Sequence, residues 1–141
     1  MQKTLPIFIA LLISLATLLV LWSLPANIWA AWKPATCLTT GCFCESATQH
    51  SPVRQIANTI SSLAFVFSGM LVMVRREHPN RLPHIYAVIM GFACILIGVG
   101  SAFYHASLTF IGQFFDVFGM FLLAALTLVY AWERIWDLRL T

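Results

Sequence analysis

Charged side chains are scarce in this sequence of 141 residues. Asp, Glu, Lys and Arg make up 9% of it, whereas they make up about 25% of an average soluble domain. Hydrophobic residues make up 60%, more than a soluble fold of this size can bury, so the lipid bilayer is the natural solvent for the chain. The net charge is only +3, and without a basic stripe the sequence gives no indication of nucleic-acid binding.

Four apolar stretches are long enough for a membrane-spanning helix, which needs about 20 residues. In lipid each must be helical, because every backbone polar group needs a partner within its own segment. We therefore predict an all-α, multi-pass transmembrane bundle that forms a single domain over residues 1–141, with an outer loop at 25–55. The predicted spans are residues 5–24, 56–74, 85–104 and 110–132.

The first stretch has a second interpretation, as a signal peptide with Lys3 in its basic n-region. We favour a retained helix, because the apolar run exceeds the 7–15 residues usual for the h-region of a signal peptide. The third stretch can continue as far as Leu108.

Basic residues near the ends of the spans predict the orientation of the chain. One side of the membrane carries Lys3, Arg75, Arg76, Arg81, Arg134 and Arg139, whereas the other carries only Lys33 and Arg54. Because basic residues favour the cytoplasm, we expect both termini there, and the outer loop on the opposite side. We expect an integral protein of a bacterial inner membrane.

Three of the four cysteines, Cys37, Cys42 and Cys44, lie together in the outer loop, while Cys94 lies in an apolar run. This cluster predicts a disulfide if the loop faces an oxidising compartment, and free thiols if it does not. A zinc site is the alternative, although the cluster has no fourth ligand at an ordinary spacing.

Polar side chains inside a span are costly, and by default they are functional candidates. Ser101 and His105 are four residues apart in the third span, so they share one helix face. Gln113 and Asp116 share a face of the fourth, where an aspartate needs a partner, a metal or a proton. The turn between these spans is short, so we expect antiparallel neighbours with both His105 and Asp116 in the outer half of the membrane. The residues alone leave open a metal site, an Asp–His pair without metal, or a packed histidine.

Other polar groups surround the start of the second span. Asn58 and Ser62 share a helix face there, and hydrogen bonding between helices is enough to explain them. Glu45 and Gln55 precede this span in the outer loop, where an acid is usually just solvated.

The segment from Gly98 to Leu108, followed by Gln113, Asp116 and Met120, resembles the alkaline ceramidase family. The family shows the pattern G-x-G-S-x-x-F-H-x-S/T-L, followed by Q-x-x-D-E-x-x-M. The pair Cys44-Glu45 and the segment beginning at Asn58 also look like the family's C-E and N-T-I/V-S motifs. The family belongs to the CREST superfamily of seven-helix membrane hydrolases and receptors, and this chain resembles the first half of that fold.

The resemblance implies a zinc-dependent intramembrane hydrolase that cleaves ceramide, or another amide-linked lipid, into a fatty acid and a sphingoid base. It implies that His105 is a zinc ligand, that Asp116 holds or deprotonates the zinc-bound water, and that Ser101 stabilises the oxyanion. Zinc suits this chemistry because it lowers the pKa of bound water to about 7 and polarises a carbonyl. The substrate would enter sideways from the lipid bilayer.

The sequence departs from the family pattern at several positions. Tyr104 replaces a phenylalanine, and Val117 replaces the glutamate that follows the aspartate. Glu45 matches a calcium-binding position, but Gln55 stands where the animal enzymes carry a calcium-binding glutamate, which counts against calcium dependence.

The largest departure is in the metal ligands, because the family takes two more zinc ligands from a late helix as H-x-x-x-H. The four histidines here are His50, His78, His84 and His105, and no two are four apart. A catalytic zinc normally has three protein ligands. We therefore expect the missing helices beyond Thr141 or in a second chain. The alternatives are a receptor-like or degenerate relative without enzymatic activity, and an unrelated membrane protein that binds a cofactor such as haem through His105.

Overall fold

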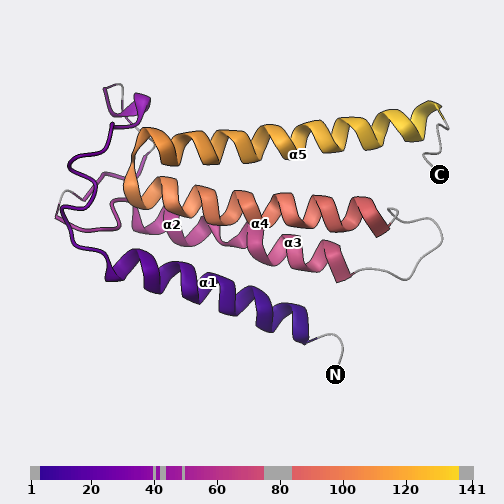
Figure 1. The fold of residues 1–141 in the computed structure, drawn as a ribbon, viewed down its shortest axis with the longest axis horizontal. Helices are drawn as coiled ribbons and strands as arrows, with labels where there is room; N and C mark the ends of the chain where they lie inside the picture. The colour runs from indigo at the N-terminus through magenta and orange to yellow at the C-terminus, as the bar shows by residue number, and fades with distance from the viewer. Residues whose placement is uncertain (1–3, 40, 42–43, 49, 75–83, 137–141) are drawn as a thin grey trace.

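A computed structural model describes residues 4–39, 41, 44–48, 50–74 and 84–136, and within this part of the chain the fold is helical. Four helical segments there are long and apolar enough to cross a membrane, in agreement with the number of spans predicted from the sequence. They run side by side in alternating directions (Figure 1). The helical elements are α1 (Leu5–Ser23), η1 (Thr36–Thr39), α2 (Ile56–Ser62), α3 (Ala64–Val74), α4 (His84–Ser107) and α5 (Phe110–Trp136).

Helix α1 matches the first predicted span except for its last residue. Leu24 is extended, with φ −75° and ψ 148°, because the following Pro25 disfavours a helical conformation in the residue before it. Helix α1 packs mainly on α3 and to a lesser degree on α4. Most of its side chains are exposed, Leu15 and Leu19 among them, as expected for a helix whose outer surface faces lipid.

The second predicted span is divided at Leu63 into α2 and α3. Around the break the backbone uses tighter bonds of the i to i−3 type, from Leu63 to Ile60 and from Val66 to Leu63. The hydroxyls of Ser61 and Ser62 both donate to the Asn58 carbonyl oxygen, at 3.1 and 2.7 Å. Serine hydroxyls that bond back to the preceding turn bend helices, which accounts for the break without a proline.

Helix α4 is the centre of the bundle, and it contacts α1, α2, α3 and α5. Small residues allow these close approaches. A Cβ atom added to Gly98 would lie 2.7 Å from the Val66 side chain on α3, and one added to Gly119 would lie 2.8 Å from Ile97 on the facing side of α4. Glycine at these positions therefore lets neighbouring backbones come closer than any larger residue would allow.

The long connection after α1 folds back onto the end of α4, at what we call the loop end of the bundle, formed by the described residues of the segment 24–55 and by residues 108–109 (Figure 1). The backbone N–H groups of Arg54 and Gln55 donate to the Ala106 and His105 carbonyl oxygens, at 3.0 and 3.1 Å. Carbonyls of a last helical turn have no partner within the helix, so these two bonds support α4 up to Ser107. Helix α4 consequently runs beyond residue 104, into the continuation toward Leu108 that the sequence allowed.

Leu108 makes the turn from α4 to α5. It has a positive φ of 48°, which is unusual for a residue other than glycine. Its N–H donates to the Tyr104 carbonyl oxygen at 2.7 Å, and its side chain is fully buried. The single left-handed residue reverses the chain direction within two residues, so α5 returns along α4. At its far end α5 continues to Trp136, one turn past the predicted boundary.

Candidate functional site

Ser101 and His105 lie one turn apart on α4, near the loop end, and both side chains are buried. Their place on the inner face follows from the glycines at 98 and 100, which bring α3 and α5 against this part of α4. Ser62, at the end of α2, places its Oγ 3.1 Å from Ser101 Oγ. The shared helix face expected from the sequence is therefore an interior face.

Asp116 lies on α5 at the membrane level of Ser101. A Cβ atom added to Gly112 would lie 2.9 Å from Tyr104 Cα, and one added to Gly119 would lie 3.3 Å from Ile97 Cα. In two antiparallel helices this register places Asp116, midway between these glycines, opposite residues 100–101. The Asp116 side chain is buried. The structure thus places Asp116 on α5 against the part of α4 that carries Ser101 and His105.

Gln55 is the residue of this site that the sequence analysis did not identify as a partner of His105. Its side chain is fully buried, and its amide oxygen Oε1 lies 2.8 Å from His105 Nδ1. From the sequence, Gln55 is only a departure at a calcium-binding position. The signal that could have found it is its place directly before the first turn of the second span.

Glu45 serves as a cap for α2. Its carboxylate oxygens accept the backbone N–H groups of Ala57 and Asn58, both at 2.8 Å. Partial burial raises the pKa of the Glu45 carboxyl, but the N–H donors of Asn58, Ala57 and Ile56 outweigh this effect, and the pKa lies below its usual value. The calcium role implied by the resemblance stays a prediction, and the contacts seen here are those of a capping carboxylate.

The loop around η1 closes over the same end of α4 and α5. Gln113 exchanges hydrogen bonds with Thr36, whose backbone N–H and hydroxyl both lie within 3.0 Å of its amide oxygen. Cys37 Sγ lies 3.0 Å from the Tyr104 hydroxyl. Both contacts hold the outer loop against the helices that carry His105 and Asp116.

Cys37 and Cys44 of the outer loop differ in oxidation state. Cys37 is disulfide-bonded, and Cys42 lies outside the described residues. Cys44 is a free thiol, as is Cys94 in α4, so Cys44 takes no part in the disulfide. Because the sulfur of Cys37 is oxidised, it cannot act as the thiolate that the alternative zinc site would need.

The donor set for a catalytic zinc is incomplete within the described residues. An imidazole and a carboxylate are suitable ligand types, and His105 and Asp116 provide one of each. However, no group of three His, Cys, Asp or Glu side chains that could hold a metal occurs in the described part of the chain. The residues present therefore fall short of a three-ligand site, and we derive no catalytic step through zinc.

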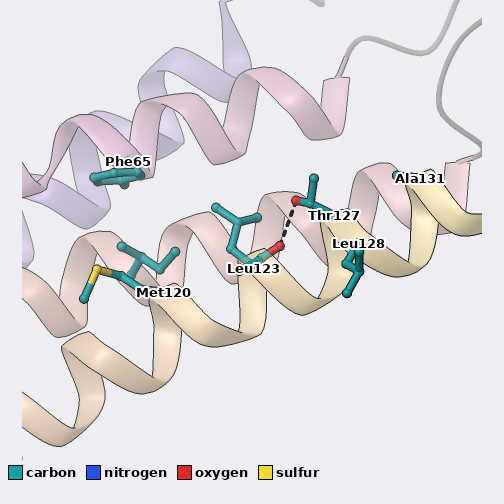
Figure 2. Close-up of a pocket in the computed structure, with 8 residues that line it drawn as sticks. Phe65, Met120, Leu123, Thr127, Leu128 and Ala131 are labelled. Atoms are coloured by element: carbon teal, nitrogen blue, oxygen red, sulfur yellow. Dashed lines mark hydrogen bonds between the residues drawn. The ribbon is translucent and has the colours of Figure 1, made fainter.

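A groove begins one helical turn from Asp116, where Met120 and Phe65 mark its near end (Figure 2). Its volume is about 630 Å³. Its only hydroxyl, on Thr127, donates to the Leu123 carbonyl oxygen at 2.8 Å, so the surface offered to a ligand is hydrocarbon. The lining residues are Phe65, Ile97, Met120, Leu123, Ala124, Thr127, Leu128 and Ala131.

The fold and the site define a class of multi-pass membrane protein with a buried Ser–His–Asp cluster near one end of its helices. Comparison with known proteins gives the family. The family model described as Ceramidase matches residues 38–138, more than half of the chain and all three residues of the cluster. The chain belongs to the ceramidase family.

Two relatives have the same name in different mammals. The chain is similar to alkaline ceramidase 1 of Homo sapiens, with 37% identity over 78 residues, and to alkaline ceramidase 1 of Mus musculus, with 38% identity over 78 residues. Each match covers 52% of this chain and 28% of the relative. The chain thus spans less than a third of the length of these relatives. No solved structure gives a significant match.

Proposed function

We propose that this chain carries part of the active site of a zinc-dependent, ceramidase-like hydrolase that cleaves the amide bond of a membrane lipid. The observation that carries the proposal is the cluster of Ser101, His105 and Asp116, three buried polar side chains within about one helical turn of one another in a member of the ceramidase family. Buried polar groups within membrane spans are costly, so a cluster of three indicates function more strongly than any one of them.

The proposed substrate is ceramide or a closely related amide-linked lipid. Hydrolysis breaks its amide C–N bond, adds the hydroxyl of water to the carbonyl carbon and leaves a fatty acid and a sphingoid base. The apolar groove beyond Met120 supports such a substrate, because it can hold a hydrocarbon chain while the amide lies beside Asp116. Lipid would reach the groove from within the bilayer.

The roles proposed for the three residues are those that the resemblance to the family implies, and the chemistry of each side chain suits its role. His105 would contribute one metal ligand, and Asp116 would orient the attacking water and take its proton. The Ser101 hydroxyl would donate a hydrogen bond to the oxyanion. Zinc at such a site supplies a polarised carbonyl and an activated water. Since the described residues provide too few ligands, the others would come from outside the described part of the chain or from a second chain.

The proposal is tested by measuring zinc content and ceramide hydrolysis. Both are measured on protein purified from membranes together with any subunit that accompanies it. We expect one zinc per assembly, and release of fatty acid and sphingoid base from ceramide in mixed micelles. His105→Ala should remove both, and Asp116→Asn should remove hydrolysis. Ser101→Ala should lower the rate about 10²–10³-fold, as loss of one oxyanion donor does.

His50 supplies the matched control, because it is an exposed histidine of the outer loop. His50→Ala should keep both zinc and hydrolysis. If the wild-type assembly holds no zinc and releases no product, or if His105→Ala changes only thermal stability, the proposal is wrong.

A second candidate is a receptor-like or degenerate member of the same superfamily without enzymatic activity. The small number of metal ligands among the described residues favours it. It predicts that ceramide binds, and protects the protein from thermal unfolding, without being cleaved.

A further inference from the structure

We propose that Gln55 is a positioning residue that fixes His105 in the tautomer with its proton on Nδ1 and its lone pair on Nε2. The proposal deepens the proposed function, and it rests on it in one respect, that the lone pair is used to bind a metal. The tautomer itself is a property of this chain and can be measured without metal.

The orientation of the Gln55 amide follows from its neighbours. Its Nε2 donates to the backbone carbonyl oxygen of Glu45 at 2.8 Å. A carbonyl oxygen can only accept, so the amide nitrogen must be on that side and Oε1 must face His105. Asn58 Nδ2, which donates to Oε1 from 3.4 Å, agrees with this orientation.

The orientation of the amide determines the protonation of the imidazole. Oε1 carries no proton, so the 2.8 Å contact with His105 Nδ1 is a hydrogen bond only if Nδ1 carries one. The neutral ring then has its lone pair on Nε2. In the opposite tautomer an unprotonated Nδ1 would face Oε1 at this distance, and two acceptors held 2.8 Å apart repel each other. The structure therefore penalises the opposite tautomer.

Gln55 also fixes the place of the ring. Its backbone N–H donates to the His105 carbonyl oxygen at 3.1 Å, so one residue holds both the main chain and the side chain of His105. Metal-binding histidines usually have their second ring nitrogen bonded to an acceptor, which fixes tautomer and ring orientation. Here the support extends to the outer loop, because the carbonyl that orients Gln55 belongs to Glu45, whose carboxylate caps α2.

The test is the ¹⁵N spectrum of metal-free, ¹⁵N-histidine-labelled protein in detergent micelles, at a pH where the imidazole is neutral. His105→Gln identifies the His105 signals. In the wild type we expect a protonated, pyrrole-like Nδ1 and an unprotonated, pyridine-like Nε2. Gln55→Leu removes the acceptor, and should lower the ratio of this tautomer to the other about fivefold or more, the effect of losing one buried hydrogen bond.

Two variants separate positioning from folding. Gln55→Glu retains an acceptor for Nδ1–H and should retain the wild-type tautomer, even if it lowers stability. Ser61→Ala removes an exposed hydroxyl from α2, the helix that directly follows Gln55, and should leave the His105 signals unchanged.

A wild-type His105 protonated on Nε2, or a Gln55→Leu spectrum equal to the wild type, would overturn the proposal. A Gln55→Leu protein that does not fold leaves the wild-type tautomer and the Gln55→Glu spectrum to decide. Because this readout is independent of metal, zinc-free and inactive protein with the expected tautomer would contradict only the proposed function.

Discussion

The polar side chains at the loop end of this protein fall into two groups with different roles, and their hydrogen bonds distinguish the two groups. Glu45 and Thr36 hold the outer loop to the helices, through the N-terminus of α2 and through Gln113. Ser101, His105 and Asp116 are instead buried between helices. Gln55 links the two groups, since it contacts both Glu45 and His105.

The capping role of Glu45 predicts a pH dependence of stability. Its pKa in the folded protein lies below the usual value of 4.5, so its contribution is complete above pH 4.5 and is lost as the pH falls through the lower, folded pKa. Glu45→Gln removes the negative charge and one of the two acceptor oxygens, and it should lower the free energy of unfolding by up to about 1 kcal/mol at pH 7.

Thermal melting in detergent between pH 7 and pH 3 measures both effects. The difference between wild type and Glu45→Gln should shrink toward the acid end of this range. Ser46→Ala, an exposed neighbour, should melt as the wild type does throughout. A difference that stays constant with pH would show that the carboxylate is not the group responsible.

At the scale of elements, the spacing between α4 and α5 decides whether Asp116 can reach the face that carries His105. Gly112 and Gly100 both lie in this contact, but with different clearance. A Cβ atom at Gly112 would lie 2.8 Å from Ser107 Oγ and 2.9 Å from Tyr104 Cα, whereas one at Gly100 would have only ordinary contacts, the nearest at 3.4 Å from the Phe115 carbonyl oxygen.

This difference predicts opposite results for two otherwise similar substitutions. Gly112→Ala should destabilise the protein by about 1–3 kcal/mol, because the methyl group forces the helices apart. Gly100→Ala should be neutral or stabilising, since alanine favours the helix by up to about 1 kcal/mol. Chemical denaturation in detergent provides the comparison, and equal losses in the two variants would contradict the helix register described here.

For the whole molecule, the arrangement of the four spans means that α1 begins and α5 ends at the same end of the bundle, opposite the loop end (Figure 1). Arg134 in the last turn of α5 lies at that opposite end, and in the sequence Lys3, Arg75, Arg76, Arg81 and Arg139 lie next to the segments that begin or end there. By the positive-inside rule we propose that both termini are cytoplasmic and that the loop end, with the His105 site, lies toward the outer side.

Single introduced cysteines test this orientation with a reagent that does not cross membranes. Cysteine at position 46, in the exposed part of the outer loop, should be labelled in intact cells. Cysteine at position 80, which lies outside the described residues, should react only after the cells are opened. The native free thiols Cys44 and Cys94 are first replaced by serine. Labelling of position 80 from outside would show that the topology is the reverse of the one proposed.

The class of this protein and most of its helix boundaries are predictable from the order of its amino acids. Four long apolar stretches in lipid can only be helices, and the polar residues inside them, Ser101, His105 and Asp116, stand out because each is costly there. The spacing of Ser101 and His105 placed them on one face of a helix without knowledge of the rest of the chain.

Which residues meet across helices and loops became clear from the folded arrangement. The contact between Gln55 and His105 joins positions 50 residues apart, and no local periodicity reports such a pair. The break at Leu63, the extension of α4 to Ser107 and the capping of α2 by Glu45 likewise depend on hydrogen bonds between or beside elements. Hydropathy indicates whether a segment prefers lipid or water, whereas these features depend on which neighbouring group forms a hydrogen bond with each polar group.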